Sequence, residues 1–374
     1  MTLFIGLMSG TSLDGVDGVL ADFGPCAAGR SAIRVLAHQQ AGFSGELRST
    51  LLRLNSRGDD ELHLAALAAN ALVRVYAGVV EKLLHRCGLG PAQVRAVGAH
   101  GQTVRHRPQE FDGTGYTLQL MNGALLAELC GIDVVCDLRS RDVAAGGQGA
   151  PLVPALHAAL FAEPGVDVAV LNLGGIGNLT LLPARGTVSG FDCGPGNALL
   201  DLWCQRHHGS AFDEGGRWAA SGQVNMGLLA VLLSEPFLQR QPPKSTGRDL
   251  FNAAWLDAAL QQVGGAAAAD VQATLAEFSA RAAADALRQH GPQSRRLRVC
   301  GGGAYNTDLM QRLAAQLPGV SVQSTDAAGV PPLQVEALAF AWLAQAFVER
   351  HSGNLTAVTG ARGPRVLGAL YPAG

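Results

Sequence analysis

The 374-residue sequence carries 28 Lys and Arg residues against 30 Asp and Glu residues, which gives a formal net charge of -2. This balance provides no basic surface of the kind that binds nucleic acid, so we expect no nucleic-acid partner. The seven cysteines are widely spread and form no Cys-x-x-Cys pair, which argues against a zinc site or a disulfide framework. The 48 glycines suit a chain whose backbone approaches a small anionic ligand closely.

The length predicts two domains or one large one. We find no signal-peptide pattern before the first apolar segment, and no apolar run that approaches a membrane span of about 18 to 20 residues. The sequence therefore predicts a cytoplasmic protein with no membrane partner.

The first predicted element is a strand over residues 3–8, followed by a polar turn and a second strand after Gly15. The turn holds Ser9, Gly10, Thr11, Ser12 and Asp14. Small residues allow backbone amides to approach phosphates, and hydroxyl groups can donate as well. The turn lacks the lysine and the following helix of a Walker A loop. An ordinary hairpin turn would use the same residue types and remains the alternative at this point.

Long amphipathic helices are predicted over residues 64–86, 267–290 and 331–350, and a strand over 94–99. Gly88 stands where a helix C-cap is preferred, and two prolines open the last helix. Strands that alternate with helices indicate an α/β protein whose sheets are mostly buried.

A second glycine turn follows a predicted strand over 168–173 and precedes another strand over 179–182. It contains Gly174, Gly175, Gly177 and Asn178, and lies close to half the chain away from the first turn. This repetition predicts a duplicated architecture. Two such turns could hold a polyphosphate by their backbone amides while a divalent cation neutralises it.

Two further features complete the pattern. Asp192 is followed by Gly194-Pro195-Gly196, a tight bend that holds the carboxylate at a strand end before a helix over 197–205. A helix-capping aspartate is the alternative. Gly301, Gly302 and Gly303 follow a strand over 297–300 and lead into a helix from Thr307. Bare backbone of this kind suits a flat base and a ribose, although a helix start also needs flexible backbone.

Eight blocks in order resemble the anhydro-N-acetylmuramic acid kinase family. They are GLMSGTSLDGVD (6–17), AHGQTVRHRP (99–108), DLRSRDVAAGGQGAPLVP (137–154), LNLGGIGN (171–178), FDCGPGN (191–197), STGRDLFN (245–252), VCGGGAYN (299–306) and VTGARGPRVLGALYP (358–372). The resemblance runs through nearly the whole chain. It implies a two-lobed α/β fold of the actin and hexokinase type, which is ribonuclease H-like, with a nucleotide cleft between the lobes. We expect residues 1–135 and the tail from about 351–374 in the first lobe, and residues 136–350 in the second.

The resemblance also implies the reaction. ATP, with Mg²⁺, phosphorylates O6 of 1,6-anhydro-N-acetylmuramic acid while water opens the anhydro bond, giving N-acetylmuramic acid 6-phosphate and ADP in peptidoglycan recycling. By this resemblance Asp192 is the base, and Glu336 lies near the nucleotide and cation. The carboxylate of Asp14 would be repelled by phosphate, so we expect it in the water shell of the metal or on a sugar hydroxyl. A homodimer is expected from the same family.

For the sugar, the resemblance points to His100, Gln102, Thr103, Arg139, Arg141 and Asp142. Muramic acid carries a lactyl carboxylate, which a guanidinium can bind through two hydrogen bonds. A structural histidine and a surface Arg–Asp pair are the alternatives for these residues. Two other functions stay open: a kinase for another 1,6-anhydrosugar such as levoglucosan, and a regulatory ATPase of the actin or Hsp70 type without sugar chemistry.

Overall fold

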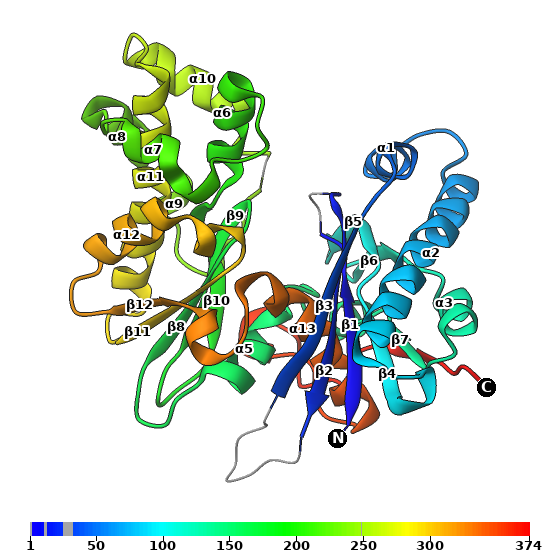
Figure 1. The fold of residues 1–374 in the computed structure, drawn as a ribbon. Helices are drawn as coiled ribbons and strands as arrows, with labels where there is room; N and C mark the ends of the chain where they lie inside the picture. The colour runs from blue at the N-terminus through cyan, green and yellow to red at the C-terminus, as the bar shows by residue number, and fades with distance from the viewer. Residues whose placement is uncertain (1, 11–12, 25–32, 248) are drawn as a thin grey trace. The chain divides into compact units, whose positions relative to one another are not determined.

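The structure, a computed structural model, describes residues 2–10, 13–24, 33–247 and 249–374 (Figure 1). The chain forms two compact units. The first contains Met1–Leu160 and Gln334–Gly374, and the second contains Phe161–Leu333.

The first unit is built on a six-stranded sheet of order β13-β7-β4-β1-β2-β3. Its strands are β1 (Leu3–Met8), β2 (Gly15–Phe23), β3 (Ile33–Gly42), β4 (Val94–Ala99), β7 (Val134–Cys136) and β13 (Ala369–Tyr371). The first three are antiparallel neighbours, and β4 and β7 continue the sheet parallel to β1. A separate ribbon pairs β5 (Gln102–Pro108) with β6 (Gly115–Leu120).

Two long helices pack on this sheet. Helix α2 (Glu61–Cys87) packs on β2 and β3, and its C-cap is Gly88 in the left-handed conformation. Helix α13 (Val335–Val348) packs on β1 and β4, where Gly6 and Gly98 lie under it. A Cβ atom at Gly6 would lie 1.9 Å from the Ala337 carbonyl oxygen, and one at Gly98 would lie 1.9 Å from the Phe340 carbonyl oxygen. These two glycines therefore allow the helix to lie directly on the strands.

The smaller helices of this unit connect the strands. They are α1 (Gly45–Arg53), α3 (Gly123–Cys130), α4 (Ser140–Ala144), α14 (Thr356–Thr359) and most of α5 (Val153–Phe161).

The second unit repeats the strand arrangement of the first. Its sheet has the order β10-β9-β8-β11-β12. The antiparallel strands are β8 (Val168–Leu173), β9 (Ile176–Leu182) and β10 (Ser189–Pro195), and the strands parallel to β8 are β11 (Arg296–Cys300) and β12 (Ser321–Ser324). In both units, three antiparallel strands are followed by two that run parallel to the first. The predicted duplication and the α/β fold of the actin and hexokinase type are confirmed.

The helices of the second unit surround a central one, α11 (Ala268–His290), which packs on β9 and β10. The others are α6 (Ala198–His208), α7 (Arg217–Ser221), α8 (Met226–Leu233), α9 (Pro236–Gln239), α10 (Ala253–Gln262) and α12 (Thr307–Gln316). Residues of α11 such as Phe278 and Leu275 join Leu171 and Phe191 of the sheet in one apolar core.

The predicted strands 3–8, 94–99 and 168–173 match the structure at both ends. The strand predicted over 179–182 begins earlier, at Ile176, so the second glycine turn is confined to Gly174 and Gly175. The boundaries between the units also differ from those predicted at 135/136 and 350/351. Strand β7 belongs to the first sheet, and α13 packs on β1 and β4 of the same sheet, so both elements lie in the first unit. The divisions between the units fall after Leu160 and Leu333.

One helix differs from the expectation about membrane-length segments. By length and composition, α2 is apolar enough to cross a membrane. Its apolar residues include Leu72, Tyr76 and Leu83, all fully buried in the core with Ile5 and Leu7 of β1. Such burial is typical of a core helix, whose apolar face packs on a sheet.

Candidate active site

In the first unit, polar residues gather where β1, β4 and β7 end. These strands are parallel, so their carboxyl ends lie at one edge of the sheet. The Ser9 hydroxyl donates to the Gly101 carbonyl oxygen at 2.9 Å and also bonds the Tyr76 hydroxyl. Gln102 donates to the Gly10 carbonyl oxygen at 3.0 Å. The first turn and the segment after β4 are thus fixed to each other by buried hydrogen bonds.

His100 is buried in this cluster and connects it to Arg139. Its Nδ1 lies 3.2 Å from the Ser9 carbonyl oxygen, and its Nε2 accepts from Nε of Arg139 at 3.0 Å. Burial, followed by the positive charge of Arg139, lowers the pKa of His100 to about 3. A neutral imidazole with a proton on Nδ1 satisfies both contacts. His100 therefore orients Arg139, which is a structural role. A direct contact between His100 and the sugar stays a prediction.

Arg139 is held by uncharged acceptors. Besides His100, it donates to the Gly149 carbonyl oxygen at 2.9 Å. Burial lowers the pKa of Arg139 to about 10, although the carboxylate of Glu336 acts in the opposite direction. Glu336 lies in the first turn of α13, so this helix brings an acidic group toward the guanidinium. A partly buried cation whose hydrogen bonds go to neutral groups is well suited to receive an anion.

The remaining predicted residues of the first unit differ in their surroundings. Gln102 is fully buried, and its Oε1 atom has no hydrogen-bond partner among the described residues, so it can accept a hydrogen bond from a ligand hydroxyl. Thr103 accepts from Gln119 at 3.2 Å. Asp14 is exposed and lies 3.9 Å from Arg48. Thr11 and Ser12 lie outside the described residues.

Arg141 and Asp142 do not form the surface ion pair that was the alternative to a role in sugar binding. Arg141 is exposed on α4. The carboxylate of Asp142 is fully buried and accepts hydrogen bonds from Gly149 N, Asn354 Nδ2 and Thr359 Oγ1 at 2.7–2.8 Å. Asp142 thus fixes α4 to Asn354 and Thr359 near the C-terminus, and its predicted contact with the sugar stays a prediction.

In the second unit, both glycine turns meet at the carboxyl ends of β8 and β11. A Cβ atom at Gly301 would lie 2.7 Å from the Leu173 carbonyl oxygen, and one at Gly303 would lie 2.5 Å from the Leu173 Cβ. Gly196 is similarly close to Gly174, since a Cβ atom there would lie 2.3 Å from the Gly174 carbonyl oxygen. Asn197 lies beside both turns: it donates to the Leu173 carbonyl oxygen at 2.8 Å, and its Oδ1 atom would lie 3.2 Å from a Cβ atom at Gly303. The structure therefore brings the predicted phosphate and adenosine turns of this unit together.

Asp192 lies near this edge, in β10 opposite Asn178 of β9. A β-bulge between Asp192 and Gly194 re-aims the strand at this point. The carboxylate accepts a hydrogen bond from Thr246 N at 2.9 Å. Burial raises the pKa of Asp192, and the bond from Thr246 opposes that rise. The residue is a strand carboxylate and does not cap α6, whose N-cap is Asn197.

A pocket of about 970 Å³ opens beside Gly302 in the second unit. This size is within the range of small-molecule sites. Its walls come from α6, from the segment before α7 and from the start of α12, and include Asn197, Asp201, Phe212, Asp213, Gly302, Tyr305, Asn306 and Asp308. Apart from the glycine turn, these residues were missed by the sequence reasoning. Asn197, Tyr305 and Asn306 stood in quoted blocks, whereas the stretch around Phe212 carries no motif.

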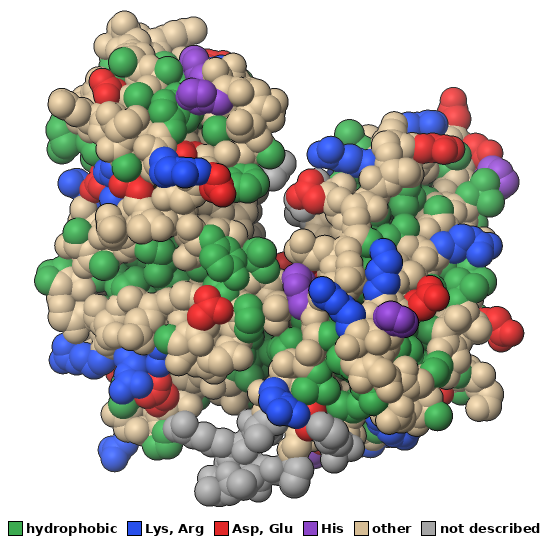
Figure 2. Space-filling model, viewed as in Figure 1, with side chains coloured by type: hydrophobic (Ala, Val, Ile, Leu, Met, Phe, Trp, Pro, Cys, Tyr) green, Lys and Arg blue, Asp and Glu red, His purple; other side chains and the backbone are tan. Residues whose placement is uncertain are grey.

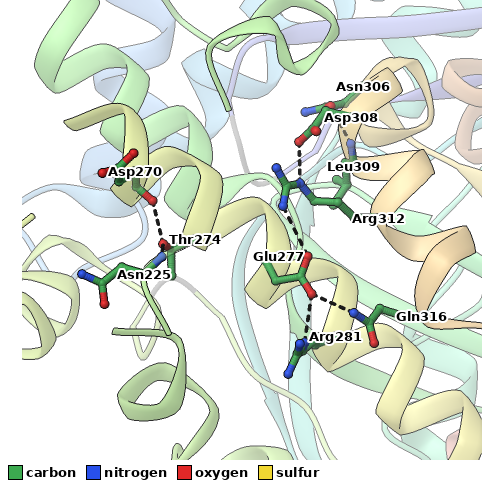
Figure 3. Close-up of polar contacts among 10 residues, drawn as sticks. All are labelled: Asn225, Asp270, Thr274, Glu277, Arg281, Asn306, Asp308, Leu309, Arg312 and Gln316. Carbon is green, nitrogen blue, oxygen red and sulfur yellow. Dashed lines mark hydrogen bonds and ion pairs between the residues drawn. The ribbon is translucent and has the colours of Figure 1, made fainter. Parts of the chain in front are cut away.

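Helix α12, whose first residues line this pocket, is held to α11 by hydrogen bonds and ion pairs (Figure 3). Arg312 of α12 donates to Asp308 at 2.7 Å and bonds Glu277 of α11 at 3.3 Å. Glu277 also accepts from Arg281 at 2.9 Å and from Gln316 at 2.7 Å. One mostly buried carboxylate therefore joins Arg312 and Gln316 of α12 to α11, and also bonds Arg281 of its own helix.

Glu277→Ala should destabilise the protein by about 2 kcal/mol, because Arg281 and Arg312 lose charged hydrogen bonds that solvent can only partly replace. The matched control is Asp285→Ala, which removes an exposed pair with Arg288 on the same helix. That change should cost less than about 0.5 kcal/mol. Urea unfolding of both variants measures the difference; equal losses would mean that the Glu277 network contributes no more than a surface ion pair.

Charge on the surface is mixed. On the face drawn in Figure 2, Lys and Arg side chains are interspersed with Asp and Glu, as the near-balanced composition predicts. Groups of three or more His, Cys, Asp or Glu side chains that could hold a metal ion are absent from residues 2–10, 13–24, 33–247 and 249–374.

Comparison with known proteins identifies the family of this chain. The profile of the anhydro-N-acetylmuramic acid kinase family matches residues 2–373. A protein named anhydro-N-acetylmuramic acid kinase from Variovorax paradoxus (strain S110) is 64% identical, covering 99% of each chain. One of the same name from Bordetella petrii is 61% identical, covering 99% of this chain and 96% of that protein.

Among solved structures, the chain is similar to the activator of the 2-hydroxyisocaproyl-CoA dehydratase from Clostridium difficile with bound ADPNP. The TM-score is 0.49 at 14% identity, with 93% of this chain and 96% of that chain covered. By the family match over nearly its full length, the chain belongs to the anhydro-N-acetylmuramic acid kinase family.

Proposed function

We propose that this protein is an ATP-dependent kinase that phosphorylates O6 of 1,6-anhydro-N-acetylmuramic acid and opens the 1,6-anhydro bond with water. The observation that carries the chemical part of the proposal is the placement of Asp192. This residue is partly buried, its carboxylate is oriented by Thr246 N, and it lies in the same unit as the two glycine turns.

In the proposed step, Asp192 takes a proton from a water molecule as the water oxygen forms a bond to C1. The bond between C1 and O6 breaks, and its electron pair stays on O6. O6 then receives the γ-phosphoryl group, and ADP leaves. The products are N-acetylmuramic acid 6-phosphate and ADP, and the proton held by Asp192 is released to solvent.

The nucleotide is proposed to lie along the second unit. Gly174, Gly175, Gly177 and Asn178 would face the phosphates, as would Ser9 and Gly10 of the first unit. Gly301, Gly302 and Gly303 would face the adenosine, with the adjacent pocket as the space for its base. Support comes from the close packing of Gly301 and Gly303 on Leu173, because any larger residue there would displace the turn.

Mg²⁺ is included in the proposal as a partner of ATP. This ion usually keeps several waters and binds through substrate phosphates and one or two carboxylates. Asp14 and Glu336 are the carboxylates proposed near its water shell. The exposure of Asp14 suits a contact through water. When bound, the ion would supply charge neutralisation to the phosphates.

Arg139 is proposed to bind the lactyl carboxylate of the sugar, with Gln102 and Thr103 near its hydroxyl groups and Arg141 at the rim. Arg139→Ala should raise KM for anhydro-N-acetylmuramic acid by about 30-fold, equivalent to about 2 kcal/mol for a lost charged hydrogen bond. Levoglucosan lacks the carboxylate, so its KM should change little. Steady-state kinetics with both sugars measure this, and an equal effect on the two would remove the carboxylate argument.

The alternatives predict other results in an assay of ADP release. We expect release that depends on anhydro-N-acetylmuramic acid and yields a 6-phosphorylated product by mass spectrometry. A preference for levoglucosan would favour a kinase for another anhydrosugar. ADP release that is independent of every sugar would favour a regulatory ATPase. A homodimer, a cytoplasmic location and a role in peptidoglycan recycling also belong to the proposal and rest on the family resemblance.

A further inference from the structure

Lys244 is an unusual lysine in this protein. The sequence has only two lysines, and the other, Lys82, is exposed on α2. The side chain of Lys244 is buried, and its ammonium group donates to the Leu238 carbonyl oxygen at 2.9 Å and lies 3.5 Å from that of Phe237. It also lies over the ring of Phe237, 5.1 Å from the centroid. Burial lowers the pKa of Lys244. Burial of an ammonium group costs free energy, and here its hydrogen bonds and its contact with the Phe237 ring fix one loop to the end of α9.

That loop is the one that holds Asp192. The carbonyl oxygen of Lys244 accepts a hydrogen bond from Asp192 N at 3.1 Å. Two residues later, Thr246 N donates to the Asp192 carboxylate at 2.9 Å. The Lys244 ammonium group also lies 5.9 Å from the centroid of Phe191, the residue before Asp192. The side chain and the backbone of Lys244 therefore hold the same short stretch from two sides.

We propose that Lys244 is a positioning residue for the reaction, which anchors the loop over residues 244–246 so that Thr246 N–H stays directed at the Asp192 carboxylate. This inference rests on the proposed function of Asp192. Lys244 acts through the loop, because its ammonium group bonds the carbonyl groups of α9, whereas the bond to the carboxylate comes from Thr246 N.

The first test is the pH dependence of kcat/KM in Lys244→Met, which keeps the apolar stem and removes the ammonium group. A hydrogen bond to the ionised carboxylate lowers its pKa, so a loosened loop should raise the pKa of Asp192 further. We expect the acid limb to move up by about one pH unit, with about a tenfold fall in kcat/KM below it. The described titratable and charged groups beside this site include Cys193, His290 and Arg240, whose guanidinium lies 6.0 Å from the Phe237 ring centroid. Cys193 has a pKa raised by burial and stays a thiol, and burial lowers the pKa of His290.

The matched control is Lys82→Met, which removes the other lysine from the first unit and should leave the pH profile unchanged. A purely structural role for Lys244 would lower the melting temperature and the maximal rate without moving the acid limb. An unmoved limb in folded Lys244→Met would therefore overturn the inference.

A second test does not require activity or a folded variant at Lys244. Selective ¹⁵N-lysine labelling gives two side-chain NMR signals, which Lys82→Met assigns. The Lys244 signal should show slow proton exchange and should shift in Asp192→Asn, since the two residues share a backbone hydrogen bond. Exchange as fast as at Lys82, together with no response to Asp192→Asn, contradicts the inference. Wild-type protein that lacks kinase activity but shows the expected NMR behaviour would mean that the proposed function fails while the anchoring stands.

Discussion

Asp192→Asn should lower kcat for product formation by about a thousandfold, within the range by which a positioned base accelerates a reaction. The amide cannot take the proton of the attacking water, yet it has nearly the same shape and can still accept from Thr246 N through its oxygen. The KM values for ATP and sugar should change far less than kcat. Steady-state kinetics, with ADP and sugar phosphate measured separately, test this.

The pH dependence of the wild type provides a second check on the same residue. The base must be ionised to act, and burial raises the pKa of Asp192. Activity should therefore be lost as the pH falls through a value above that of an ordinary aspartate, and this limb should be absent from the residual activity of Asp192→Asn. If Asp192→Asn retained more than about a tenth of the wild-type kcat, Asp192 would not be the base.

Gly98→Ala should destabilise the protein by more than about 3 kcal/mol, or prevent folding, because the new methyl group has no space. Its position lies 1.9 Å from the Phe340 carbonyl oxygen and 2.7 Å from the Phe340 carbonyl carbon. Both atoms belong to the backbone of α13, so the helix must move away from β4. Circular dichroism and urea unfolding measure the loss.

Gly78→Ala is the matched control, since it makes the same substitution within the same unit. Gly78 lies inside α2, and a Cβ atom there would meet no described heavy atom within 4 Å apart from its chain neighbours and the adjacent backbone of the same helix. This change should stabilise the protein by up to about 1 kcal/mol, because alanine is the better helix former. If the two variants unfolded at the same urea concentration, the close contact of α13 with the sheet would be refuted.

Much of the fold could be predicted from local sequence patterns. Apolar runs that end in glycine turns indicated β1, β8 and β11, and amphipathic periodicity indicated α2 and α11. The unit boundaries were harder to place, because they depend on where α13 packs. Gly6 and Gly98, which allow that packing, carry no local signal for the helix that they contact.

The position of the candidate residues on the fold was predictable in part. The glycine turns and the bend after Asp192 were visible in the sequence because glycine and proline determine the local backbone, whereas the role of Asp192 as a base was implied by the family resemblance and stays a prediction. The different surroundings of Arg139 and Asp142 were not visible there, since they arise from residues far away in sequence. Arg139 depends on His100 and Gly149, and Asp142 depends on Asn354 and Thr359. The pocket beside Gly302 is assembled from three separate segments, and no single stretch of sequence indicates it.

We expect this one enzyme to couple phosphoryl transfer to opening of the anhydro ring. The most direct measurement is the mass of the product formed from ATP, Mg²⁺ and 1,6-anhydro-N-acetylmuramic acid in ¹⁸O-labelled water. We predict a 6-phosphorylated sugar with one labelled oxygen at C1, formed in equal amount to ADP and lost in Asp192→Asn. ADP accompanied by unaltered sugar, or a phosphorylated sugar with its anhydro ring intact, would contradict the account.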